Sequence, residues 1–187
     1  MIDKELEKIS EEFHKMESAR GEFWFMAQKL MKEGYDIEAY ILILATWNFA
    51  AWRNGMRTFD LKKFKETIKN LEPTLKKFKN KKFENANLED PELVEDIKLV
   101  YNELKEIVMQ TGAAKVMAIE NPKFFVMWDT KIRKMYGIKN SASANDYVRF
   151  LKKIQNEFGD IKWKDKRVPL AKAIDEYNFV QTQKELL

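Results

Sequence analysis

Three observations on the sequence predict an all-α fold in the form of a compact helical domain. Apolar side chains recur three and four positions apart through most of the 187 residues, which is the spacing of one face of a helix. Residues that start and stop helices bound these stretches, and no pair of alternating, strand-like segments joined by a hairpin turn is found. We expect a single domain over residues 1–187, with the alternative of two lobes that meet near residues 111–137.

Each expected helix has a recognisable start or end. Gly34 and Gly137 stand where C-terminal caps are expected, because glycine readily adopts the left-handed conformation of that position. The run 39–45 is apolar on all sides, which indicates a helix at the centre of the domain. The residues expected to cap helix N-termini are Asp36, Asp60, Asp90, Asp129 and Ser143. The expected helices are 2–33 with a break at 20–21, 36–53, 61–71, a short helix opened by Pro73, 91–110, 112–120, 130–136, 144–158 and a last helix opened by Pro169.

The composition excludes several classes of site. The chain has no Cys and a single His, which excludes disulfides, iron–sulfur clusters, zinc fingers and Cys nucleophiles, and we expect neither a metal nor a cofactor. His14 lies among charged residues of the first helix and is expected to be solvated surface. The apolar runs are too short to span a bilayer, and the start lacks the apolar core of a signal peptide. We therefore expect a cytoplasmic, nucleoid-associated protein without a membrane partner, most simply a monomer.

Charge is segregated along the chain. The net charge is +4, but residues 57–82 are strongly basic, whereas the first helix and residues 84–96 are acidic. A second basic group, formed by Lys131, Arg133 and Lys134, lies on the expected helix 130–136. Segregation of this kind creates a field that attracts polyanions such as nucleic acids. The alternative is that these helix faces are only solvated.

The segment 111–137 carries the most informative pattern. It reads Thr111-Gly112-Ala113-Ala114-Lys115, then an apolar run that ends at Trp128, then Asp129-Thr130-Lys131-Ile132-Arg133-Lys134-Met135-Tyr136-Gly137. This segment, about a seventh of the chain, resembles the core of the helix-hairpin-helix DNA glycosylases, as a divergent, archaeal-type member. In that superfamily a Gly-rich turn opens a helix that carries a Lys, and an apolar run leads to Asp-Thr and a basic helical turn.

The resemblance implies a function, but the segment departs from the family pattern at three points. It implies a DNA-repair glycosylase that excises a damaged base from duplex DNA, an oxidised purine being one candidate, with or without an associated lyase step. It also implies a catalytic Asp129 and a Schiff-base Lys115. The family hairpin Leu-Pro-Gly-Val-Gly-x-Lys is reduced here to Thr-Gly-Ala-Ala-Lys, the interval from Lys115 to Asp129 is short, and Lys131 stands where the family has His. Whether Lys115 reaches the site is left open by these departures.

Elementary chemistry supports the same two residues. Breaking an N-glycosidic bond builds positive charge on the deoxyribose, and a carboxylate such as that of Asp129 stabilises this state or activates a water. Lys115 lies between apolar residues, and a partly buried amine loses its proton more easily and can attack C1′. The alternatives are that Asp129 only caps a helix and that Lys115 extends to solvent or binds a phosphate.

Other residues are candidates for contacts with the DNA. Glycosylases stack an extruded base on aromatic rings, and the candidate contacts to that base are Trp47, Asn48 and Trp128. Asn48 could instead be a hydrogen-bonded polar group of the core. The candidate contacts to the DNA backbone are Gly112, Lys131, Arg133 and Lys134. A weaker polar cluster on the last helix consists of Asp175, Tyr177 and Asn178.

Three functions therefore stay open. The first is the glycosylase. The second is a nucleic-acid-binding protein on the same scaffold without catalysis, which the shortened hairpin favours. The third is a helical protein whose acidic and basic faces bind partner subunits.

Overall fold

A computed structural model describes residues 2–17, 19–138, 142–164 and 167–184. Within these ranges the chain forms nine α-helices and one short 3₁₀ turn, and no strand, which confirms the all-α prediction. The elements are α1 (Ile2–Glu17), α2 (Ala19–Lys32), α3 (Asp36–Trp47), α4 (Phe49–Gly55), α5 (Leu61–Phe78), η1 (Phe83–Asn85), α6 (Pro91–Glu120), α7 (Thr130–Met135), α8 (Ala144–Phe158) and α9 (Leu170–Lys184).

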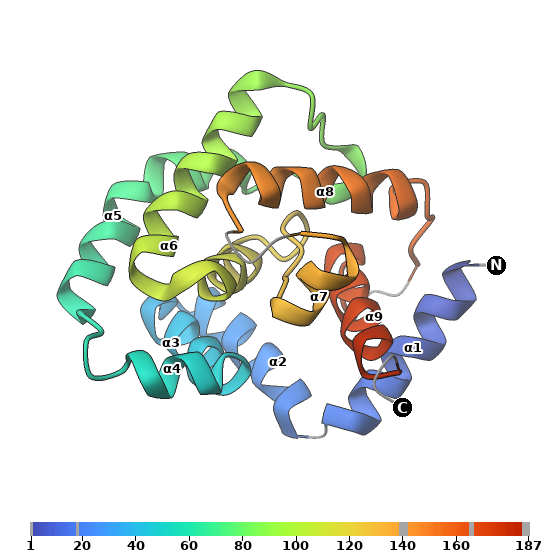
Figure 1. Ribbon diagram of the computed structural model, residues 1–187, viewed down its shortest axis with the longest axis horizontal. Helices are drawn as coiled ribbons and strands as arrows, with labels where there is room; N and C mark the ends of the chain where they lie inside the picture. Colours follow the sequence, from blue (N-terminus) through green and yellow to red (C-terminus); the bar gives the residue numbers. More distant parts are fainter. Residues whose placement is uncertain (1, 18, 139–141, 165–166, 185–187) are drawn as a thin grey trace.

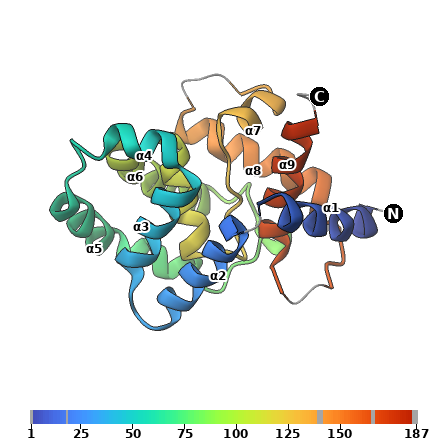
Figure 2. The same cartoon turned by 90° about the horizontal axis from the view of Figure 1, so that it is seen from below.

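The long helix α6 organises the molecule. It packs against α3, α5 and α8, while α2 lies along α3 (Figures 1 and 2). The first and last helices, α1 and α9, lie side by side, and the short helix α7 packs against α9 (Figure 1). Within the described ranges, no helix combines the length and the apolar character needed to cross a membrane.

Most buried apolar side chains belong to one cluster. It extends from Leu6 of α1 to Ile174 of α9, and its centre contains the fully buried rings of Trp128, Tyr101 and Tyr147. A smaller cluster joins α1 to α9 through Ile9, Phe13 and Val180. The two ends of the described chain therefore cover one side of the same core.

The N-terminal half contains two breaks that differ from the predictions. The helix expected over 2–33 is divided into α1 and α2 before the predicted break at 20–21. Gly34 ends α2 with a φ of +83°, as predicted, and the Tyr35 amide donates to the Leu30 carbonyl over 2.9 Å. The helix expected over 36–53 is interrupted at Asn48, which has φ −124° and ψ 31°. Asn is a poor residue for a helix interior, because its side chain competes for backbone hydrogen bonds.

Two predicted helix starts are wrong. Asp36 is the first residue of α3, and the N-cap position is Tyr35, which makes no capping hydrogen bond through its side chain. Pro73 does not open a new helix but lies inside α5, which starts at the predicted cap Asp60. Pro73 and Lys69, whose carbonyl loses its helical partner, are both exposed, so solvent can satisfy that carbonyl. The apolar stripe through Phe64, Leu71, Leu75 and Phe78 holds the helix together across the proline.

Helix α6 contains a sharp turn. Asp90 caps its start and Pro91 occupies the first turn, as predicted. The predicted division between helices 91–110 and 112–120 is present as a break at Met109, whose φ of 62° and ψ of 177° are not helical. This backbone conformation is strongly disfavoured for a residue with a side chain. The second part of α6 therefore leaves the turn in a new direction and carries Lys115.

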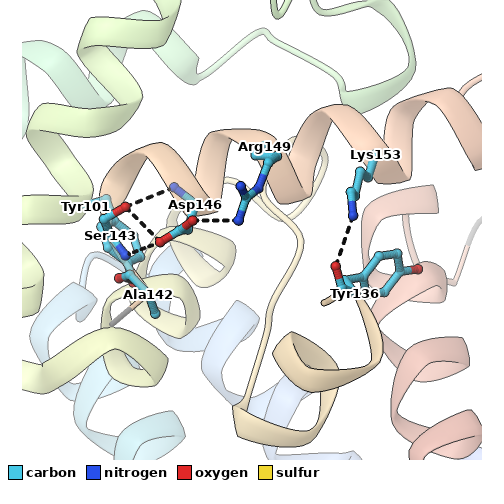
Figure 3. A network of polar contacts seen from close by, with 7 residues as sticks. All are labelled: Tyr101, Tyr136, Ala142, Ser143, Asp146, Arg149 and Lys153. Atoms are coloured by element: carbon cyan, nitrogen blue, oxygen red, sulfur yellow. Dashed lines mark hydrogen bonds and ion pairs between the residues drawn. The ribbon is translucent and has the colours of Figure 1, made fainter. Parts of the chain in front are cut away.

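Capping side chains fix the helices that follow. Ser143 and Asp146 form a capping box at the start of α8: the Asp146 amide donates to Ser143 Oγ, and the Ser143 amide donates to Asp146 Oδ2 over 2.9 Å (Figure 3). Two bonds attach neighbouring loops to this region, since Tyr101 donates to the Ala142 carbonyl and Lys153 to the Tyr136 carbonyl, each over 3.0 Å (Figure 3). The position of α7 relative to α8 is set in this way.

Candidate active site

Asp129 stands at the N-terminus of α7. The segment 124–128 before it lies outside any helix and is wholly buried, so it leads from the core to Asp129, which is partly exposed. The Asp129 carboxylate accepts a hydrogen bond of 2.8 Å from the Ile132 amide, which confirms the predicted cap. One carboxylate oxygen is sufficient for this bond, and the side chain remains partly exposed.

Lys115 approaches the same place from the second part of α6. Its side chain is part of the core, with 7% of the residue exposed. Its amine donates to the backbone carbonyl of Trp47, at the end of α3. Carbonyls in the last turn of a helix lack intrahelical partners, so the interruption at Asn48 provides the acceptor for Lys115.

The two residues line the same cavities. An inner cavity of about 50 Å³ is lined by both Lys115 and Asp129, and its other walls include Phe13, Glu17, Trp47, Asp175 and Phe179. Next to it lies an outer groove of about 790 Å³, and Lys115 and Asp129 line this groove as well. The inner cavity holds little more than one or two waters. A nucleobase therefore fits the outer groove but enters the inner cavity only if the walls move.

Two of the predicted base contacts lie at these cavities, and the third is a core residue. Trp47 lines both cavities, and Asn48 lines the outer groove at the break between α3 and α4. Trp128 borders the inner cavity but is completely buried. Its indole donates to the Gln110 carbonyl over 3.2 Å and its ring packs against Tyr101 and Tyr147. Trp128 therefore forms part of the wall of the inner cavity and not of the outer groove.

The predicted backbone contacts separate into two groups. Lys131 and Lys134 are exposed on α7, and Lys131 lines the outer groove. Arg133 is buried: it donates to Thr111 Oγ1 and Thr130 Oγ1, both over 3.1 Å, and its guanidinium lies 5.5 Å from the Trp128 ring. Gly112 is also buried, against Val108 and Leu44. These last two residues attach α7 and the α6 turn to the core. Arg133 also belongs to the lining of the outer groove, whereas Gly112 does not.

Exposed apolar side chains flank the outer groove. Phe49 of α4 is 60% exposed, and Met109 at the turn of α6 is 57% exposed. Both belong to the lining of the groove that contains Lys115 and Asp129. The groove therefore combines a cationic side, at Lys131, with an apolar rim.

A buried ionic cluster on α9 adjoins the inner cavity. Lys172 pairs with Asp175 over 3.0 Å and with Glu176 over 3.1 Å. Burial raises the pKa of Asp175, and the ammonium group of Lys172 opposes this rise. Burial by itself would lower the pKa of the Lys172 amine. The carboxylates of Glu176 and Asp175 outweigh this effect, and the pKa of the amine lies above its usual range. Lys172 is therefore a fixed cation in the core.

The sequence indicated only part of this cluster. Asp175 appeared in the weaker polar cluster of the last helix, whereas Lys172 and Glu176 were missed. Their signal was present as a Lys followed three and four residues later by acids, with only apolar residues between Lys172 and Asp175. His14, expected on the surface, has a side chain only 33% exposed, and its Nε2 lies 3.7 Å from Glu176 Oε1.

Within the described part of the chain, no group of three or more His, Asp or Glu side chains is arranged to hold a metal ion. In comparisons with known proteins, no protein-family model matches the chain, and neither a curated protein nor a solved structure matches it.

Proposed function

We propose that this protein is a DNA glycosylase that excises a damaged base, with Asp129 and Lys115 as its catalytic residues. The observation that carries the proposal is that Lys115 and Asp129, 14 residues apart in sequence, line one cavity that opens into a large groove. The short interval between them, a departure from the helix-hairpin-helix pattern, does not separate the two side chains in space. The break of α6 at Met109 directs the helix of Lys115 toward the end of α3.

The chemistry requires a carboxylate and an amine on the two sides of the deoxyribose. As the bond from C1′ to the base breaks, its electron pair leaves with the base, which takes up a proton. The carboxylate of Asp129 stabilises the positive charge that develops on the sugar. The neutral amine of Lys115 forms the new bond to C1′ and loses a proton. The bond from C1′ to O4′ then breaks, its electron pair stays on O4′, which takes up a proton, and the nitrogen is left as a protonated imine of C1′.

The outer groove suits a nucleotide extruded from a duplex. Its volume of about 790 Å³ lies in the range of small-molecule sites. Lys131 provides a charge for phosphate at its edge. Exposed apolar side chains such as Phe49 and Met109 are of the type that enters the space left by an extruded base.

One observation favours a second function, a nucleic-acid-binding protein without catalysis. The inner cavity of about 50 Å³ is too small for a base as it stands. A protein that only binds DNA has no need to enlarge it.

Cleavage of lesion-containing DNA separates the two functions. Duplex oligonucleotides that each contain one lesion, such as an oxidised purine, uracil or an alkylated purine, are incubated with the protein and then treated with alkali to reveal base loss. We expect excision of at least one lesion and none from undamaged duplex.

Asp129→Asn is the decisive variant for this assay. It keeps the oxygen that accepts from the Ile132 amide and removes the charge, so excision should fall at least about 100-fold while the melting temperature and DNA affinity persist. Binding of all duplexes without excision would support the second function, and excision by Asp129→Asn at the wild-type rate would reduce Asp129 to a cap.

A further inference from the structure

Lys172 lies in the first turn of α9 with a side chain only 1% exposed. Its Nζ lies 3.0 Å from Asp175 Oδ2 and 3.1 Å from Glu176 Oε1. Glu176 also accepts a hydrogen bond of 2.5 Å from Ser10 Oγ of α1. The cluster thus holds one cation and two carboxylates at the contact between the first and last helices.

Three aromatic rings surround the same ammonium group. The Lys172 Nζ lies 4.6 Å from the ring centroids of Phe13 and Trp47, and 5.2 Å from that of Trp24. Ring faces attract a cation at this distance. Burying charges costs free energy that apolar side chains of similar volume would not cost. The cluster therefore indicates a role beyond packing.

Lys172 contacts two of the groups around Lys115. The ring of Trp47 lies over Lys172, while the carbonyl of Trp47 accepts from the amine of Lys115. Asp175 pairs with Lys172 and lines the inner cavity together with Lys115. A change at Lys172 is transmitted to Lys115 by both routes.

We propose that Lys172 is a positioning residue for Lys115: it fixes Trp47 and Asp175 at the cavity wall, and its charge favours the neutral, nucleophilic form of the Lys115 amine. The inference deepens the proposed function and rests on it for its purpose. Without Lys172, the carboxylate of Asp175 would be available to pair with the Lys115 ammonium and stabilise it. A fixed cation nearby disfavours the protonation of a second amine.

Other charged groups line the same cavities as Lys115. They come from α1, from the start of α7 and from α7 itself, and they are Glu17, Asp129, Lys131 and Arg133. Substitution of Lys172 leaves all four in place, so a change in the titration of Lys115 reports on Lys172 and its partners.

The experiment titrates Lys115 in the DNA-free protein by NMR, with ¹³C-labelled lysine and with Lys115→Arg to identify the signal. In Lys172→Met, the pH at which Lys115 is half protonated should rise by about one unit or more. Lys184→Met is the matched control, because it removes an exposed ion pair of 3.0 Å with Glu12 between the same two helices. It should leave the titration of Lys115 unchanged.

A second variant guards against misfolding. Lys172→Met combined with Glu176→Gln removes one charge of each sign and should still give a rise, but a smaller one, because the lost carboxylate also favours a protonated amine nearby. A folded variant in which Lys115 titrates as in the wild type would overturn the assignment. Failure of both variants to fold would also overturn it, because Lys172 would then serve the fold itself.

The test is independent of activity. If Lys115 shifts as expected but the wild-type protein excises no base, the proposed function fails and the coupling of Lys172 to Lys115 stands. In an active protein, Lys172→Met should also shift the pH dependence of the rate of imine formation to higher pH.

Discussion

Gly112 occupies a position without room for a side chain. A Cβ there would lie 2.8 Å from the Cβ of Val108 and 3.2 Å from Cδ2 of Leu44. The backbone after the turn of α6 can therefore approach α3 closely, and this contact places the following helix, with Lys115, against the end of α3. The glycine that the sequence suggested for a phosphate is explained by packing.

Gly112→Ala should destabilise the protein by about 1–3 kcal/mol, because the added methyl group forces the turn away from Val108. Chemical denaturation measures the decrease. Gly55→Ala is the control: no atom lies within 4 Å of its Cβ position, so its stability should equal or slightly exceed that of the wild type. Equal stability of the two variants would show that Gly112 has space.

Individual residues were predictable where their role is local. Asp60, Asp90, Asp129 and Ser143 cap the helices they precede, because a cap depends only on the next three residues. Lys172 could not be predicted in the same way. Its environment is assembled from α1, α2, α3 and α9, and no local pattern indicates that Phe13, Trp24 and Trp47 meet at its ammonium group.

Among the elements, α6 has a bend that the site requires. The helix is broken at Met109, whose positive φ of 62° is strained for a residue with a side chain. The strain is located at the rim of the groove, where Met109 is 57% exposed. The core contacts on both sides of the turn hold the residue in this conformation.

Met109→Gly should raise the free energy of unfolding by about 1 kcal/mol, because glycine adopts this backbone conformation without most of the strain. Part of the gain is lost, because glycine loses more backbone entropy on folding than other residues do. Met109→Ala removes the same exposed side chain without freeing the backbone and should show no gain. Urea denaturation of the two variants gives the comparison. A Met109→Gly variant no more stable than Met109→Ala would show that the turn is unstrained.

Of the wrongly predicted elements, the break at Asn48 combines the poor helix preference of Asn with a tertiary contact, whereas at Pro73 tertiary contacts outweigh local preference. The apolar residues on both sides of Asn48 indicate one continuous helix, whereas the chain breaks there and the freed carbonyl of Trp47 receives Lys115. Pro73 indicates a helix start, but buried side chains before and after it keep α5 continuous. In both cases a partner on another helix contributes.

On the scale of the whole molecule, the outer groove is the feature that a duplex could cover. The groove lies between α4, the turn of α6 and α7, and Lys131 adds positive charge to it. The inner cavity extends from this groove toward α1 and α9. A duplex that binds over the groove would therefore place its backbone along α7.

Lys131→Glu should weaken binding to duplexes of all sequences alike and should reduce the slope of log affinity against log salt by about 0.9 for each phosphate that is no longer neutralised. Lys134→Glu, one turn away on the same exposed helix, should act in the same direction. Lys29→Glu on α2, outside the lining of the groove, is the control. Fluorescence anisotropy at several salt concentrations measures these slopes, and an equal weakening in all three variants would argue against a binding face at α7.

If Lys115 and Asp129 act together on the sugar of a damaged nucleotide, borohydride should trap the protein on the DNA. An imine between Lys115 and C1′ is reduced by borohydride to a permanent protein–DNA cross-link, which peptide mapping assigns to a residue. We predict a cross-link at Lys115 with lesion-containing duplex, its loss in Lys115→Gln, and its strong reduction in Asp129→Asn. A cross-link that persists in Lys115→Gln, or its absence from a protein that binds the damaged duplex, would contradict the account.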